Sequence, residues 1–143
     1  MQTRRGSTLR GVITLSLMAV NVVFWVPILL VVALAKLIIP LAAWRRWTSA
    51  LMIWIAQAWI SCNGAIFSLM GALLLEVDGV EGLDPRSWYL VLSNHQSWVD
   101  ILVLQKVLHR RVPFLKFFLK RQLLYVPVMG LAWWALDFPF MQR

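Results

Sequence analysis

The chain of 143 residues is 61% hydrophobic and only 14% charged, and its mean hydropathy is +0.74. Water-soluble domains average about half apolar and about a quarter charged residues, so this composition argues against a free-standing soluble domain. The net charge is +8, but the basic residues flank apolar stretches, so we exclude nucleic acid and expect membrane lipid as the partner. The single cysteine, Cys62, has no Cys or His neighbour, which excludes an intrachain disulfide and a zinc site.

Two uncharged runs, 11–35 and 47–75, open the chain. A helix of about 20 apolar residues crosses a bilayer core, so either run is long enough to span. A small-residue tripeptide at 33–35 resembles a signal cleavage site, but the uncharged stretch exceeds the roughly 7–15 residues of a signal peptide's apolar region. We therefore predict an uncleaved membrane anchor over residues 1–75, with apolar helical segments at 11–39 and 47–75.

The topology of this anchor stays open. With the amino terminus in the cytoplasm, two spans return residue 76 to the cytoplasm. The connecting loop carries Lys36, Arg45 and Arg46, however, and the positive-inside tendency opposes placing it outside. Pro27 allows an alternative, a kinked or re-entrant first segment followed by a segment in the interface. Both arrangements place the downstream part on the cytoplasmic side, and we expect a bacterial inner membrane.

Two asparagines interrupt the apolar runs, Asn21 in the first and Asn63 in the second. A polar side chain inside an apolar helix either marks a functional path or hydrogen-bonds to a neighbouring helix, and we favour the second interpretation. Trp44 and Trp47 flank two arginines, which is typical of residues at the level of lipid headgroups.

The composition changes at residue 76. Residues 76–85 hold four carboxylates, two glycines and a proline, which indicates a turn and linker. The elements predicted after it are a buried strand at 88–92, a helix at 97–109, a strand at 114–118, a helical turn at 120–124, a helix at 126–136 that begins near Pro127, and a strand at 138–141. This order predicts an α/β layer built on a membrane anchor.

Polar residues follow the predicted strand 88–92, and they include His95 and, five positions later, Asp100. Residues five apart on one helix are turned about 140° from each other, so the two side chains could not meet there. If His95 lies in a loop and Ser97 begins the helix, the first turn can carry the Asp100 carboxylate back to the imidazole, which makes a general base. Ser97 and Asp100 also fit a capping box, in which Asp100 only binds backbone amides. Both interpretations stay open.

These residues resemble the first motif of the glycerolipid acyltransferases, which include the 1-acylglycerol-3-phosphate acyltransferases. That motif, Asn-His-x4-Asp, is matched by Asn94, His95 and Asp100. Residues 120–130 are similar to the family's Lys-x-x-Leu-x-x-x-Pro-x-x-Gly segment, which begins here at Lys120.

The family's second motif, Gly-x-x-Phe-Ile-x-Arg, is similar to residues 137–143. Phe140 and Arg143 match it, whereas Asp137 replaces the glycine and Met141 the isoleucine, which puts the local turn in question. Three elements in the expected order make the resemblance specific over about residues 75–143.

The resemblance implies an incomplete acyltransferase α/β domain over 76–143. It implies acyl transfer from acyl-coenzyme A or acyl carrier protein to the free hydroxyl of a lysophospholipid, converting lysophosphatidic acid to phosphatidic acid. His95 would take the hydroxyl proton, Asp100 would orient the imidazolium, and Arg143 would hold the glycerol phosphate. Substrate-binding roles are also implied for Asn94, Phe140 and Lys120. The reaction uses no cofactor and no metal.

The family's third motif, containing Glu-Gly-Thr-Arg, and its fourth motif have no counterpart in this sequence. Loss of such preorganised donors lowers a rate by about 100- to 1000-fold each. We therefore expect a fragment of an acyltransferase with little activity of its own. The alternative is a small non-enzymatic membrane anchor or partner subunit, in which residues 94–100 only cap a helix.

Overall fold

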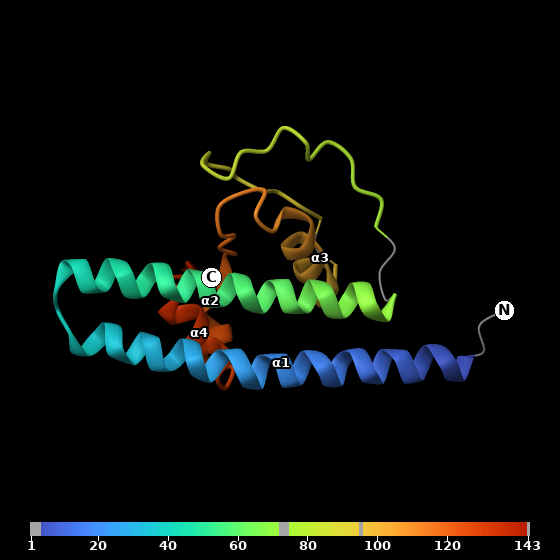
Figure 1. Ribbon diagram of the computed structural model, residues 1–143, viewed down its shortest axis with the longest axis horizontal. Helices are drawn as coiled ribbons and strands as arrows, with labels where there is room; N and C mark the ends of the chain where they lie inside the picture. Colours follow the sequence, from blue (N-terminus) through green and yellow to red (C-terminus); the bar gives the residue numbers. More distant parts are fainter. Residues whose placement is uncertain (1–3, 72–74, 95, 143) are drawn as a thin grey trace. The chain divides into compact units, whose positions relative to one another are not determined.

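Helices dominate the computed structural model, which describes residues 4–71, 75–94 and 96–142 (Figure 1). In chain order the elements are α1 (Arg4–Ile38), α2 (Ala42–Met70), α3 (Trp98–Leu108), β1 (Leu119–Lys120), the 3-10 helix η1 (Arg121–Tyr125), α4 (Met129–Ala135) and β2 (Phe140–Met141). The predicted α/β class therefore holds only in part, because the strands of the described residues are two residues long.

Two compact units make up the chain. The first unit contains Met1–Asn21 and Trp59–Leu115, and the second contains Val22–Ala58 and Lys116–Arg143. Each of the two long helices, α1 and α2, contributes one part to each unit. The predicted division between an anchor at 1–75 and a domain at 76–143 is based on the change of composition at residue 76, and it stays a prediction.

The two apolar runs form helices, as predicted. Thr8–Ile38 within α1 has a mean hydropathy of 2.6 and Ala42–Met70 has one of 1.5, so both are long and apolar enough to cross a membrane. Many of their large apolar side chains are exposed, which suits association with lipid. α1 continues through Pro27, and the two membrane topologies stay open.

Hydrogen bonds join α1 to α2 within each unit. In the first unit, Asn21 Nδ2 donates to Asn63 Oδ1 at 2.9 Å and to the Trp59 carbonyl at 3.2 Å. In the second unit, Trp44 Nε1 donates to the Ala35 carbonyl at 3.0 Å. The interpretation of the two asparagines as a hydrogen-bonded pair between helices is confirmed.

The strand predicted at residues 88–92 is wrong. The segment has no regular secondary structure, although its exposure alternates as in a strand, from 96% at Trp88 to 40% at Tyr89 and 76% at Leu90. A strand also needs a neighbour that accepts its ladder hydrogen bonds. The strands of the described residues, β1 and β2, pair with each other in the second unit.

α3 matches the helix predicted at 97–109. Ser97 is its N-cap residue, and a type II turn ends it: the Arg111 N–H donates to the Leu108 carbonyl at 3.0 Å, and His109 and Arg110 occupy the central positions. Arg110 takes the second central position with φ 61°, where glycine or asparagine is usual because φ must be positive. Pro113 follows and prevents continuation of the helix.

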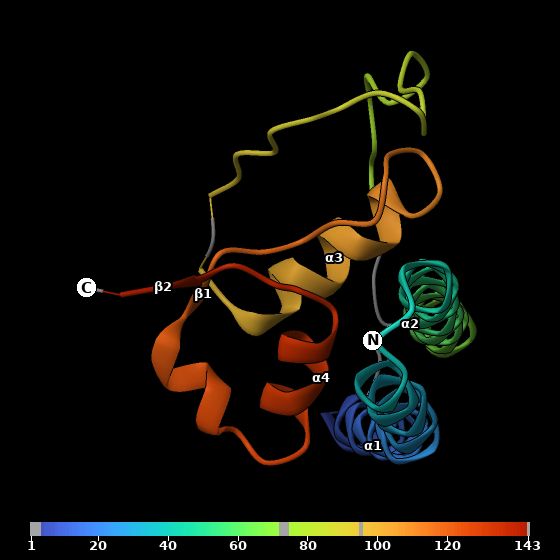
Figure 2. The same cartoon turned by 90° about the vertical axis from the view of Figure 1, so that its left-hand side faces the viewer.

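β1 and β2 are parallel neighbours in the second unit, with Leu119 opposite Phe140 and Lys120 opposite Met141 (Figure 2). η1 and α4 connect them, which is the predicted strand–helix–strand order. The strand predicted at 114–118 is wrong, since the pairing begins at Leu119, whose N–H donates to the Pro139 carbonyl at 2.9 Å. The strand predicted at 138–141 is confirmed only at its last two residues, because its partner β1 is itself two residues long.

The start of α4 lies directly against η1. A Cβ on Gly130 would overlap the carbonyl oxygen of Leu124 and approach its carbonyl carbon to 2.6 Å. Just before it, the Met129 N–H donates to the Pro127 carbonyl at 2.7 Å and Val128 has φ 67° and ψ −53°, a classic γ-turn. The turn and the glycine together allow the chain to reverse within a few residues.

Candidate active site

The residues of the first motif lie at the amino-terminal end of α3 in the first unit. Asn94 is exposed in the preceding loop, and His95 lies outside the described residues. Ser97 has extended backbone angles, φ −149° and ψ 161°, as expected of an N-cap residue. Residues 96 and 97 therefore lead directly into the first turn of α3.

The Asp100 carboxylate closes this loop. Its Oδ2 accepts the backbone N–H groups of Gln96 and Ser97, both at 2.6 Å, and its Oδ1 accepts the Ser97 hydroxyl at 3.2 Å. The capping box predicted for Ser97 and Asp100 is thus confirmed. The same bonds hold the carboxylate at the residue that follows His95, so capping and a role beside His95 are compatible. The pairing of His95 with Asp100 stays a prediction.

Lys120 and Phe140 belong to the second unit. They lie on the paired strands β1 and β2, where Phe140 is opposite Leu119 and Lys120 is opposite Met141. Lys120 is exposed and Phe140 is half-buried. The strand pairing brings these two predicted substrate-binding residues onto adjacent strands, whereas Asn94 and Asp100 belong to the other unit. Arg143 lies outside the described residues.

A C-terminal cap on α4 explains the glycine position of the second motif. The Asp137 N–H donates to the Trp134 carbonyl and the Phe138 N–H to the Trp133 carbonyl, both at 3.0 Å. These two bonds define a Schellman motif, in which the residue after the C-cap has left-handed backbone angles and is usually glycine. Asp137 takes that position with φ 57°. The turn is therefore preserved although the glycine is replaced.

Two further contacts, which the sequence analysis did not anticipate, tie α3 to α2 in the first unit. His109 Nε2 lies 2.8 Å from Ser61 Oγ, and Lys106 Nζ donates to Ser68 Oγ at 3.0 Å. Burial, and secondly the positive charge of Arg110, lower the pKa of His109 below its ordinary value. The i, i+3 spacing of Lys106 and His109 puts them on one helix face, but a partner across the chain is not visible in a sequence.

A groove of about 360 Å³ opens elsewhere in the first unit. Its wall is apolar apart from Glu81, Arg110 and Arg111. None of the described site residues, Asn94 and Asp100 included, lines it. We therefore place the candidate site at the α3 amino terminus and not in this groove.

Known proteins match the carboxyl-terminal half of the chain. The family model named Acyltransferase matches residues 74–143. Over 70 residues the chain is 40% identical to "1-acyl-sn-glycerol-3-phosphate acyltransferase alpha" of Mus musculus and of Homo sapiens, which is 48% of this chain but only 23% of each relative. No solved structure matches the chain significantly. Residues 74–143, slightly less than half of the chain, thus match the acyltransferase family.

Proposed function

We propose that the chain carries the general-base part of an acyltransferase that acts on a lysophospholipid, with lysophosphatidic acid as the acceptor and phosphatidic acid as the product. The acyl donor is a thioester, acyl-coenzyme A or acyl carrier protein. Relatives named as 1-acyl-sn-glycerol-3-phosphate acyltransferases support this acceptor. Two long apolar helices support a membrane location, where an insoluble acyl chain is already present.

In the proposed mechanism, His95 removes the proton from the acceptor hydroxyl while the oxygen attacks the thioester carbonyl. The tetrahedral intermediate then expels the thiolate, which takes the proton back from His95 and leaves as a thiol. Asp100 orients the imidazole and stabilises its protonated form. No covalent enzyme intermediate is needed, because the acceptor oxygen attacks directly.

The single observation that carries this proposal is the position of the Asp100 carboxylate. Its bonds to the Gln96 and Ser97 N–H groups hold an acid at the chain position next to His95. A carboxylate fixed in this way needs no reorganisation when the imidazole becomes charged, which is how preorganised groups lower a barrier.

In the second unit, Arg143 provides a planar, bidentate group for the acceptor's phosphate. Lys120 adds a positive charge, and Phe140 adds an apolar surface beside it. Asn94, next to His95, provides a hydrogen-bonding side chain for the acceptor.

The test is acyl transfer by the full chain in phosphatidylcholine vesicles, with labelled oleoyl-coenzyme A and 1-oleoyl lysophosphatidic acid. We expect labelled phosphatidic acid at a low rate, lost in His95→Ala. His109→Gln, at the chain's other histidine, is the matched control and retains the product. Equal product from the parent chain and His95→Ala would contradict the proposal.

The second candidate function is non-enzymatic, a membrane anchor or partner subunit. The capping bonds of Asp100 favour it, because they give this residue a structural role that needs no substrate. The same assay separates the two candidates, since an anchor forms no product in any variant.

A further inference from the structure

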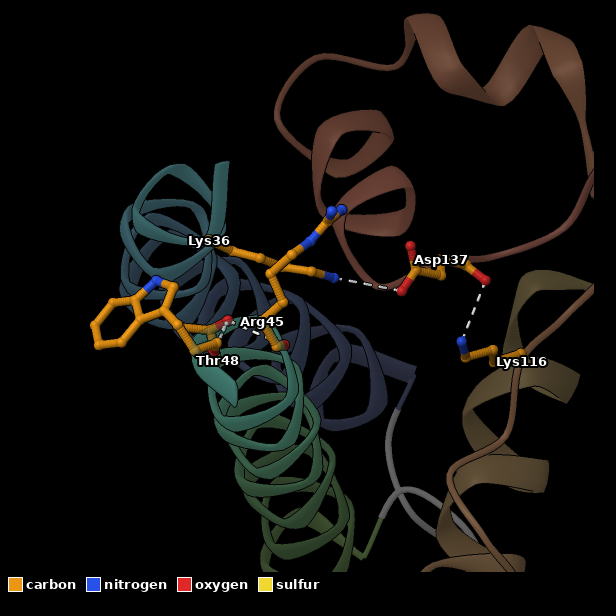
Figure 3. A network of polar contacts seen from close by, with 6 residues as sticks. Lys36, Arg45, Thr48, Lys116 and Asp137 are labelled. Carbon is orange, nitrogen blue, oxygen red and sulfur yellow. Dashed lines mark hydrogen bonds and ion pairs between the residues drawn. The ribbon is translucent and has the colours of Figure 1, made fainter. Parts of the chain in front are cut away.

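Asp137 links the chain segment before β2 to the end of α1 within the second unit. Its Oδ2 lies 3.5 Å from Lys36 Nζ, and its backbone carbonyl accepts a hydrogen bond from Lys116 Nζ at 3.3 Å (Figure 3). The Lys36 side chain is only 15% exposed, whereas that of Asp137 is 68% exposed. Asp137 is thus joined to two lysines from separate segments, to Lys36 through its carboxylate and to Lys116 through its backbone carbonyl.

The backbone at Asp137 does not explain why a carboxylate is present. The Schellman motif at the end of α4 needs a residue with positive φ, and Asp137 supplies it at φ 57°. Glycine would take this conformation more easily because it has no Cβ. Aspartate enters the left-handed region more readily than most residues, but still less readily than glycine. The side chain therefore needs a reason outside the cap, and the contact with Lys36 supplies one.

The link bears on the candidate substrate-binding residues. Residues 138–142 follow Asp137 directly, and Phe138 is buried and stacks on Phe117, with ring centroids 6.4 Å apart. Phe140 comes next, on β2. A tether at Asp137 thus fixes the point from which this segment leaves α4, relative to the last turn of α1.

We propose that Asp137 is a positioning residue: its carboxylate, held by Lys36, places β2 with Phe140, the segment that leads in sequence to Arg143, for binding of the phosphate-bearing acceptor. This inference rests on the proposed function for its role in the reaction. The tether itself is independent of that function. Removal of the carboxylate leaves Lys36 without its partner, so that the segment loses its link to α1. The hydrogen bond from Lys116 to the backbone carbonyl stays, because the carbonyl is present in every variant.

A spectroscopic test examines the tether without any need for activity. Spin labels replace Leu41 and Met141, both exposed side chains of the second unit, in a Cys62→Ser background, and electron–electron distances are measured in vesicles. We expect a narrow distance distribution in this parent. We expect a broad one in Asp137→Gly, which keeps the helix cap, and also in Asp137→Asn and Lys36→Met. A distribution that stays narrow in Asp137→Gly would overturn the tether.

A kinetic test examines the role in substrate binding. In Asp137→Gly and Asp137→Asn, KM for lysophosphatidic acid rises about three- to tenfold, with a smaller change in kcat, because uniform binding is lost. Lys36→Met gives the same rise and adds nothing to Asp137→Asn, since coupled residues are non-additive. Asp78→Asn, at an exposed carboxylate of the first unit, is the matched control and leaves KM unchanged.

The two tests fail in different ways. An inactive parent chain with a narrow distance distribution would contradict the proposed function and leave the tether intact. A broad distribution in the active parent, or additive effects of Lys36→Met and Asp137→Asn on KM, would overturn the positioning role while the acyl transfer stands.

Discussion

At the scale of single residues, charged side chains occupy backbone positions that favour glycine. Arg110 and Asp137 both have positive φ, in a type II turn and in a Schellman motif. Positive φ costs a residue with a Cβ some free energy, which the surrounding structure offsets. At Asp137 the side chain also makes an ion pair, with Lys36. The sequence comparison with the second motif exposes the replaced glycine, but the ion pair depends on α1, which is about 100 residues earlier in the chain.

His109 makes the stability of the first unit depend on pH. Its pKa in the folded chain lies below its ordinary value of 6.5, through burial and then Arg110. As the pH falls below about 6.5, His109 is therefore protonated in the unfolded chain before it is protonated in the folded chain. The free energy of unfolding has its full value above this pH and declines below it.

We therefore expect the melting temperature of the parent chain in detergent to fall more between pH 7.5 and pH 5 than that of His109→Gln. The comparison with His109→Gln also removes the contribution of the carboxylates, because they titrate in both proteins. An equal fall of the melting temperature in both proteins over this pH range would contradict the role of His109.

At the scale of elements, local signals predicted the helices and only part of one strand, at 138–141. Ser97 and Pro113 mark the two ends of α3, and the uncharged runs predict α1 and α2, because capping and apolar length are properties of the segment itself. The strand at 88–92 failed because strand formation depends on a partner elsewhere in the chain. The same holds for the candidate site. The capping bonds of Asp100 join neighbouring residues and were predicted, whereas the Ser61–His109 contact joins distant parts of the chain and was not predicted.

The contact between η1 and α4 gives a prediction at this scale. A Cβ at position 130 meets the Leu124 carbonyl, which is backbone and cannot rotate away. Gly130→Ala should therefore lower the free energy of unfolding by about 1–3 kcal/mol, the usual range for overpacking. Chemical denaturation of the chain in detergent measures it.

Gly11→Ala is the matched control, because nothing lies within 4 Å of its Cβ position and alanine favours a helix. A Gly130→Ala chain as stable as the parent would show that α4 does not pack closely on η1.

At the scale of the whole molecule, apolar surface and positive charge occur together. α1 exposes large apolar side chains such as Leu15 and Val23, while the net charge is +8. Exposed apolar surface of this kind indicates a membrane or protein partner, and cations are attracted to anionic headgroups. The composition predicts both features, but not which part of each helix belongs to which compact unit.

These two contributions respond differently to salt. Electrostatic attraction is screened at 1 M NaCl, where the Debye length is about 3 Å, whereas apolar burial persists. We expect the chain to stay with sedimented vesicles in 1 M NaCl and to leave them only in detergent. Release by salt alone would contradict an apolar anchor.

The central claim is that His95 acts as the general base of acyl transfer. Its most direct measurement is the initial rate of labelled phosphatidic acid formation by His95→Gly, with and without added imidazole. General-base catalysis contributes typically about 10²- to 10⁴-fold, so we predict a loss of that size and partial recovery with imidazole, which supplies the missing base. A His95→Gly chain that keeps the parental rate would contradict the claim.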